Sequence, residues 1–88
     1  MTMADRIQSK LTQVFAPESL EVIDESEQHR GHGGWREGGE THFRVRMISD
    51  SFTGQSRLAR QRAVNRCLAD EFADGVHALA MELRAPND

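Results

Sequence analysis

The sequence predicts one small α/β domain of the α+β kind, with elements in the order helix, strand, strand, helix, strand. The first observation behind this prediction is that apolar residues recur at helical spacing in two segments. The second is that apolar and polar residues alternate in three shorter segments. The third is the length of 88 residues, which suffices for a single hydrophobic core. We therefore expect residues 1–88 to fold as one domain.

The first helix is predicted over residues 3–15. Its apolar residues fall on one face, and they are Met3, Ile7, Leu11, Val14 and Phe15. Pro17 prevents the helix from continuing, because proline lacks a backbone N–H and clashes with the preceding turn. Residues 20–24 then alternate well enough to predict a short strand.

The second strand is predicted over His42–Ile48. Phe43, Val45 and Met47 share one of its faces, and His42, Arg44 and Arg46 share the other. This pattern indicates that one side of the sheet is covered and that the other is partly solvated. Residues 26–39 hold five of the seven glycines, so we expect a long, flexible loop between the first two strands.

The second helix is predicted from an N-cap at Ser56 to about Ala73, with Gly75 at its C-terminal end. On a helical wheel its buried stripe consists of Val64, Leu68 and Phe72, with Cys67 beside them. The opposite face carries Arg62 and Arg66, with Ala59, Ala69 and Ala73.

Residues 77–83 alternate as a third strand, and residues 85–88 form a short tail. A strand–helix–strand crossover makes the second and third strands parallel, whereas the first hairpin is antiparallel. The prediction is therefore a three-stranded mixed sheet with both helices packed on one face.

Composition narrows the classes of function. No apolar run approaches membrane-spanning length and the N-terminus does not resemble a signal peptide, so we expect a cytoplasmic protein without a membrane partner. Cys67 is the only cysteine, which excludes an internal disulfide. The net charge of −3 disfavours broad nucleic-acid binding, although arginines concentrate in the second helix at positions 57, 60, 62 and 66.

The histidines are the candidate metal ligands. His29 and His32 stand three residues apart in the loop, but spacing alone favours two solvated imidazoles, because a metal site normally needs three or four ligands. His77 shares a face with Leu79 and Met81, where a lone histidine is more often a core-edge residue.

For two other residues, His42 and Trp35, a purely structural role is at least as well supported as a functional one. His42 is expected to be a strand-surface residue, and Trp35 is expected to be exposed, either as a partner anchor or as a loop aromatic resting on the domain. We expect no enzymatic activity, because tyrosine is absent, the one cysteine is predicted to be buried and no Ser/His/Asp set is recognisable.

Three sequence blocks resemble the BolA family. They are ETHFRVRMISDSFTG at residues 40–54, Asp24-Glu25-Ser26 before it and Val76-His77-Ala78-Leu79-Ala80 after it. The blocks keep the family order from about residue 5 to residue 84. The resemblance implies a fold similar to the type II KH fold, usually with a further C-terminal helix for which this sequence is too short.

The resemblance also implies a function. The histidine of the Val-His-Ala-Leu element is a metal-ligand position in the family, which here is His77, and its partner in the loop would be His29 or His32. BolA proteins pair with monothiol glutaredoxins, which contribute a cysteine thiolate and a bound glutathione to a shared 2Fe–2S cluster. We therefore expect a monomer without cofactor when alone, and a cluster-bearing heterodimer with glutaredoxin in iron–sulfur trafficking or iron-dependent regulation.

The alternative is a DNA-binding transcriptional regulator. Some BolA proteins are regarded as such, and an exposed helical face bearing arginines can contact phosphates. The residues involved would be Arg57, Arg60, Arg62 and Arg66. A plainer reading pairs Arg66 with Asp70 across one helical turn on a solvated surface.

Overall fold

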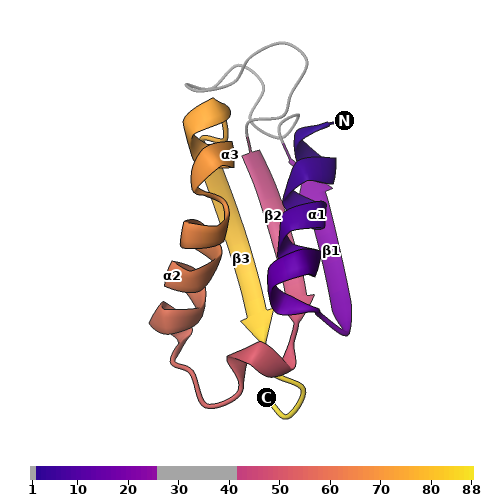
Figure 1. Cartoon of the computed structure of the whole chain (residues 1–88), viewed down its shortest axis with the longest axis vertical. Coiled ribbons are helices and arrows are strands. Elements are labelled where there is room, and N and C mark those ends of the chain that lie inside the picture. Colours follow the sequence, from indigo (N-terminus) through magenta and orange to yellow (C-terminus); the bar gives the residue numbers. More distant parts are fainter. Residues whose placement is uncertain (1, 26–41) are drawn as a thin grey trace.

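The computed structural model describes residues 2–25 and 42–88. Its elements follow the predicted order, with a short 3-10 turn and a divided second helix in addition (Figure 1). They are α1 (Met3–Phe15), β1 (Ser19–Asp24), β2 (His42–Ile48), η2 (Asp50–Phe52), α2 (Arg57–Cys67), α3 (Ala69–Asp74) and β3 (Ala78–Arg84). The bounds of α1 and β2 agree with the sequence prediction.

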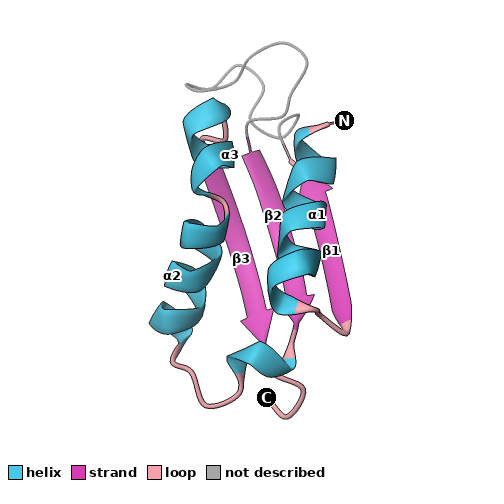
Figure 2. Cartoon of the chain, viewed as in Figure 1, coloured by secondary structure: helices cyan, strands magenta, loops and turns pink. Residues whose placement is uncertain are grey.

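The sheet is three-stranded and mixed, with β2 in the centre. β1 pairs antiparallel with β2, and β3 pairs parallel with β2. Figure 2 shows the helices lying over one face of this sheet, so the predicted topology and layering are confirmed. Phe43, Val45 and Met47 of β2 are buried beneath the helices, as the alternation predicted.

The core joins α1, β2 and α2. Ile7 and Leu11 of α1 and Val64 of α2 are fully buried, and the rings of Phe15 and Phe52 lie 5.1 Å apart. Val14 was expected in this stripe, but its residue is 60% exposed. The prediction for Val14 was wrong because the last turn of α1 reaches the core through Phe15 alone.

Both ends of α1 are fixed by hydrogen bonds. Thr2 and Asp5 form a reciprocal capping box at the first turn, which satisfies two backbone N–H groups that have no intrahelical acceptor. At the other end Ala16 adopts a left-handed conformation, with φ of 43°. The hydroxyl of Ser49 donates to the carbonyl of Phe15 at 2.6 Å, which ties the end of α1 to the end of β2.

The predicted second helix is interrupted at Leu68. This residue has φ of −102° and ψ of 20°, outside the helical range, and it divides the segment into α2 and α3. Leu68 is nevertheless buried, so the break keeps its side chain in the core while the chain changes direction. The prediction of one continuous helix was wrong, whereas Gly75 does end the segment with a positive φ of 140°.

The C-terminal tail folds back onto the domain. Ala85 is buried, and the Asp88 carboxylate accepts a hydrogen bond from the backbone N–H of Ala85 at 3.0 Å and pairs with Arg60. Across the described residues, no helix combines the length and apolar character that a bilayer crossing requires.

Candidate functional site

His77 lies in the turn between α3 and β3, immediately before the first residue of the strand. Its side chain is exposed, and its ring stacks beside that of His42 with centroids 6.1 Å apart and an interplanar angle of 15°. The reading of His77 as a core-edge residue was therefore wrong. The imidazole is accessible at the end of the sheet.

His42 is the residue whose ring stacks with that of His77, and its environment differs from the one predicted from the sequence. It is the first residue of β2, aligned with Ala78 of β3, and only 9% of it is exposed. The expectation of a strand-surface residue was wrong. Alternation along β2 assigns a side of the sheet to each residue, but it does not reveal that His77 from a distant turn packs against this one.

The segment that carries the loop histidines is attached at the same end of the sheet. The described chain stops at Glu25 after β1 and resumes at His42, and the Glu25 N–H donates to the His42 carbonyl at 2.8 Å. The Glu25 carboxylate also accepts from Arg44 Nε at 2.9 Å. Both attachment points thus lie at the end of the sheet where β3 begins, and His42 is the one in contact with His77.

His29, His32 and Trp35 lie outside the described residues, so their predicted roles remain predictions. Within residues 2–25 and 42–88, no group of three or more histidine, cysteine, aspartate or glutamate side chains gathers to hold a metal ion. The described part of the site therefore offers one accessible imidazole donor, and a complete metal site needs further donors from elsewhere.

Cys67 is a poor candidate for such a donor. It ends α2, is half-buried rather than fully buried as predicted, and its Sγ lies 3.8 Å from the Lys10 carbonyl. Burial raises the pKa of the Cys67 thiol, because removing water penalises the thiolate. A metal ligand must be the thiolate, so this sulfur is unsuited to the role.

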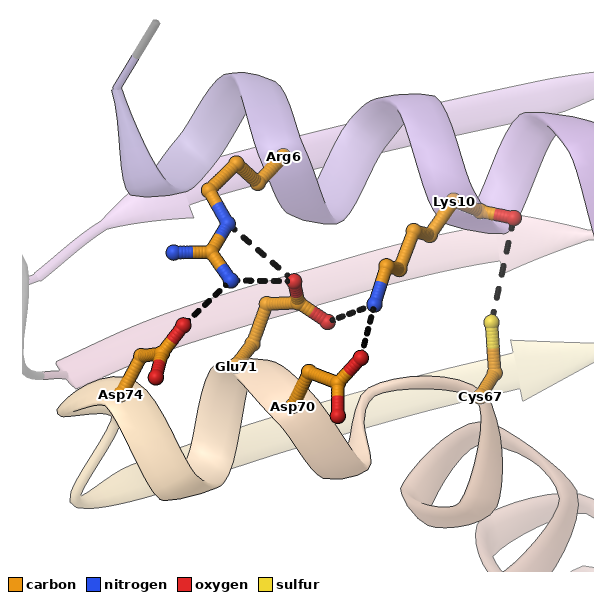
Figure 3. A network of polar contacts seen from close by, with 6 residues as sticks. All are labelled: Arg6, Lys10, Cys67, Asp70, Glu71 and Asp74. Atoms are coloured by element: carbon orange, nitrogen blue, oxygen red, sulfur yellow. Dashed lines mark hydrogen bonds and ion pairs between the residues drawn. The ribbon is translucent and has the colours of Figure 1, made fainter.

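A buried carboxylate supports the turn that carries His77. Glu71 of α3 is only 1% exposed, and its Oε2 accepts from Arg6 Nη2 of α1 at 2.8 Å (Figure 3). Its Oε1 lies 2.9 Å from Lys10 Nζ, and Arg6 also reaches Asp74 at 2.7 Å. The hydrogen bond to Glu71 raises the pKa of Lys10, and those to Asp74 and Glu71 raise that of Arg6. α3 is thereby anchored to α1 a few residues before His77.

Sequence reasoning missed Glu71, although a signal was present. Glu71 follows Val64 by two helical turns and so falls on the buried stripe of the wheel. Glutamate is almost never fully buried unless it is paired, and its partners here, Arg6 and Lys10, come from α1, more than 60 residues earlier in the chain.

The four arginines of the second helix do not share one environment. Arg57, Arg62 and Arg66 are exposed. Arg60 donates to the carbonyls of Gln55 and Leu83 and pairs with the Asp88 carboxylate. Its guanidinium is thus engaged within the molecule. The predicted pair between Arg66 and Asp70 is not formed. Within the described chain the Asp70 carboxylate lies 3.4 Å from Lys10 Nζ instead.

Comparison with known proteins identifies the family. The family model for BolA-like proteins matches residues 11–88. The chain belongs to the BolA-like family. It is 43% identical to the DNA-binding transcriptional regulator BolA of Escherichia coli strain K12, over 92% of this chain and 73% of that protein. It is 49% identical to a Sinorhizobium sp. protein described only by its position in the cobS 5' region, over 100% of this chain and 96% of that protein.

Solved structures agree with this assignment. The BolA domain of SufE1 from Arabidopsis thaliana superposes with a TM-score of 0.89 at 40% identity, covering 99% of this chain and 95% of that one. The BolA1 protein of Mus musculus gives a TM-score of 0.79 at 39% identity, over 97% of this chain and 66% of that one. The family resemblance and the α+β fold predicted from sequence are both confirmed.

In this BolA-like chain the end of the sheet combines an exposed imidazole, a second imidazole packed against it and two anchored loop ends. Such an arrangement can donate nitrogen to a metal ion, and imidazole suits zinc, copper, iron and nickel. The geometry alone does not select among these metals, so the choice depends on the donors that complete the site.

Proposed function

We propose that this chain is a BolA-type adaptor that binds a monothiol glutaredoxin and shares ligation of a 2Fe–2S cluster with it. The observation that carries the proposal is the accessible imidazole of His77 beside the two attachment points of segment 26–41. The ligands from this chain would be His77 and either His29 or His32. The protein would act in the cytoplasm, in iron–sulfur cluster trafficking or iron-dependent regulation.

The number of ligands requires a partner. Each iron of a 2Fe–2S cluster takes two ligands besides the bridging sulfides. Two histidines supply one iron only, and the Cys67 thiol is held protonated by burial. The remaining iron therefore needs donors from another molecule, and a glutaredoxin cysteine thiolate with a bound glutathione meets that need.

Histidine ligation would give the shared cluster two distinctive properties. A cluster with nitrogen on one iron and thiolate on the other has a higher reduction potential than one with thiolates alone. Protons also compete with the metal for imidazole, so cluster transfer would be favoured at lower pH. The Glu71 contacts with Arg6 and Lys10 support this site indirectly, because they fix α3 and hence the turn that leads to His77.

The test is anaerobic reconstitution with iron, sulfide, glutathione and a monothiol glutaredoxin, followed by visible absorption and circular dichroism. Wild type is expected to give a heterodimer spectrum that differs from that of the glutaredoxin homodimer. His77→Ala is expected to lose that spectrum, and the loss in either His29→Ala or His32→Ala would identify the loop ligand. Cys67→Ser is the matched control, and its spectrum should equal that of wild type.

Two results would contradict the proposal. One is a glutaredoxin homodimer spectrum that does not change when the wild-type chain is added. That result would exclude shared ligation of the cluster. The other is a heterodimer spectrum that survives in His77→Ala but disappears in Cys67→Ser. That result would place the ligand on α2 instead of at His77. Size-exclusion chromatography of each mixture separates loss of ligation from loss of partner binding.

DNA binding is a second candidate, because the E. coli and Vibrio cholerae relatives carry the name DNA-binding transcriptional regulator BolA. The residues for it would be Arg57, Arg62 and Arg66, which are exposed. A DNA binder should lose affinity steeply between about 50 and 200 mM salt, and again in Arg62→Gln with Arg66→Gln. An affinity for DNA that changes neither with salt nor in the double variant would exclude DNA binding.

A further inference from the structure

We propose that the outer stripe of α2, formed by Leu58, Arg62 and Arg66, binds an acidic protein segment that carries an apolar side chain between its carboxylates. This surface is separate from the cluster site, and the proposal does not depend on the glutaredoxin partnership. It rests on the position, exposure and charge of these three side chains.

The three residues follow one another at four-residue spacing, so they form a line along the helix. Leu58 is 54% exposed, and it and Val14 are the two large exposed apolar residues of the described chain. The stripe borders a shallow hollow whose floor includes Ala59 and Ala63. Small residues there let another chain approach the helix closely.

Charge distribution indicates the chemistry of the ligand. α2 contains no aspartate or glutamate. Among the other basic residues of the described chain, Arg6, Lys10, Arg44, Arg46 and Arg60 each have a carboxylate partner, whereas Arg57 and Arg84 form no ion pair there. No carboxylate of the described residues pairs with Arg62 or Arg66. In a protein with a net charge of −3, this stripe is a cationic surface that is complementary in charge to an acidic segment of another molecule.

Two features favour a protein segment over nucleic acid. An exposed leucine gains from apolar contact but offers nothing to a phosphate backbone. Two arginines on the stripe neutralise only about two phosphates, which gives weak and strongly salt-dependent binding.

The start of the stripe lies at the end of the domain away from the cluster site. Arg60, next to the stripe, donates to the carbonyl of Leu83 near the end of β3, whereas His77 precedes the start of that strand. Seven residues of strand separate the two by about 20 Å. Figure 1 shows the start of α2 near the C-terminal end of β3, away from α3 and the start of that strand. A partner that binds at the start of α2 would therefore leave His77 accessible.

The test uses the whole chain labelled with 15N and a synthetic helical peptide with one leucine flanked by glutamates at four-residue spacing. A second peptide with glutamine at those positions is the probe control. The glutamate peptide should shift the α2 amides and bind, and affinity should fall about fivefold for Leu58→Ala and more for Arg62→Gln with Arg66→Gln. Arg46→Gln, on the uncovered face of the sheet, is the matched single-charge control and should bind like wild type.

Three results would overturn the proposal. The first is equal affinity for the glutamate and glutamine peptides, and the second is a fall in affinity in Arg46→Gln as large as in the arginine double variant. The third is tighter binding to a 20-base-pair duplex than to the peptide at 100 mM salt, with no effect of Leu58→Ala. That last result assigns the stripe to nucleic acid.

Discussion

Replacing Glu71 by glutamine should destabilise the domain, because it removes the buried charge that joins α3 to α1. Glu71 is 1% exposed, and its carboxylate contacts Arg6 at 2.8 Å and Lys10 at 2.9 Å. Glutamine keeps the shape of the side chain, but its amide group places a donor against an ammonium or a guanidinium that needs an acceptor.

The magnitude follows from the exposure of the three partners. Removing one member of a fully buried ion pair costs about 3–5 kcal/mol, because the other charge is left without water. Here the side chains of Arg6 and Lys10 are 32% and 35% exposed, so water can solvate both once the carboxylate is gone. We therefore expect a loss of about 2 kcal/mol in the free energy of unfolding, or on the order of 10 °C in Tm.

Urea denaturation followed by far-ultraviolet circular dichroism measures this loss, and the chain offers a matched control. Asp70→Asn makes the same chemical change one residue earlier, on a carboxylate whose side chain is 83% exposed and 3.4 Å from Lys10. It should cost less than about 0.5 kcal/mol. If Glu71→Gln costs no more than Asp70→Asn, or if Glu71→Gln is equally costly in an Arg6→Met, Lys10→Met background, the reasoning fails.

Three further predictions concern other parts of the domain. The Arg60 hydrogen bond lowers the pKa of the Asp88 carboxyl in the folded chain, so the tail contact stabilises the fold at neutral pH and is lost as the pH falls below about 4. An NMR titration of that carboxyl tests this prediction, and an ordinary pKa for Asp88 would contradict it. The raised pKa of Cys67 keeps its thiol protonated near pH 7, so iodoacetamide should modify it several-fold more slowly than it modifies glutathione, and an equal rate would show an open thiol. Gly54 has φ of 79° with nothing within 4 Å of an added Cβ, so Gly54→Ala should cost about 1 kcal/mol in urea denaturation through backbone strain alone, and a neutral variant would show that the turn relaxes.

The proposed adaptor role and the proposed acidic partner make separable demands on the chain. His77→Ala tests the first through a cluster spectrum, and Leu58→Ala tests the second through peptide affinity. The stripe starts beside the end of β3, whereas His77 precedes the start of that strand. The two variants therefore test surfaces that are built from different elements.

The sequence by itself determined the order of the helices and strands and the bounds of α1 and β2. Periodicity is a local property, so the alternation of β2 and the stripe of α1 are readable without any knowledge of the fold. Pro17 and Gly75 mark the ends of their elements for equally local reasons. Proline fixes its own φ and lacks a backbone N–H, whereas glycine can adopt a positive φ. The blocks around His77 carried the family resemblance, and with it the candidate site.

The tertiary structure alone decided which polar groups meet. The ring of buried His42 stacks with that of His77, which comes 35 positions later in the chain, and buried Glu71 pairs with Arg6 and Lys10 of α1. The break at Leu68 likewise reflects packing, because no proline or glycine marks it in the sequence. Each of these features depends on contacts between residues far apart in the chain, and the free energy of such a contact exists only once the fold has brought the partners together.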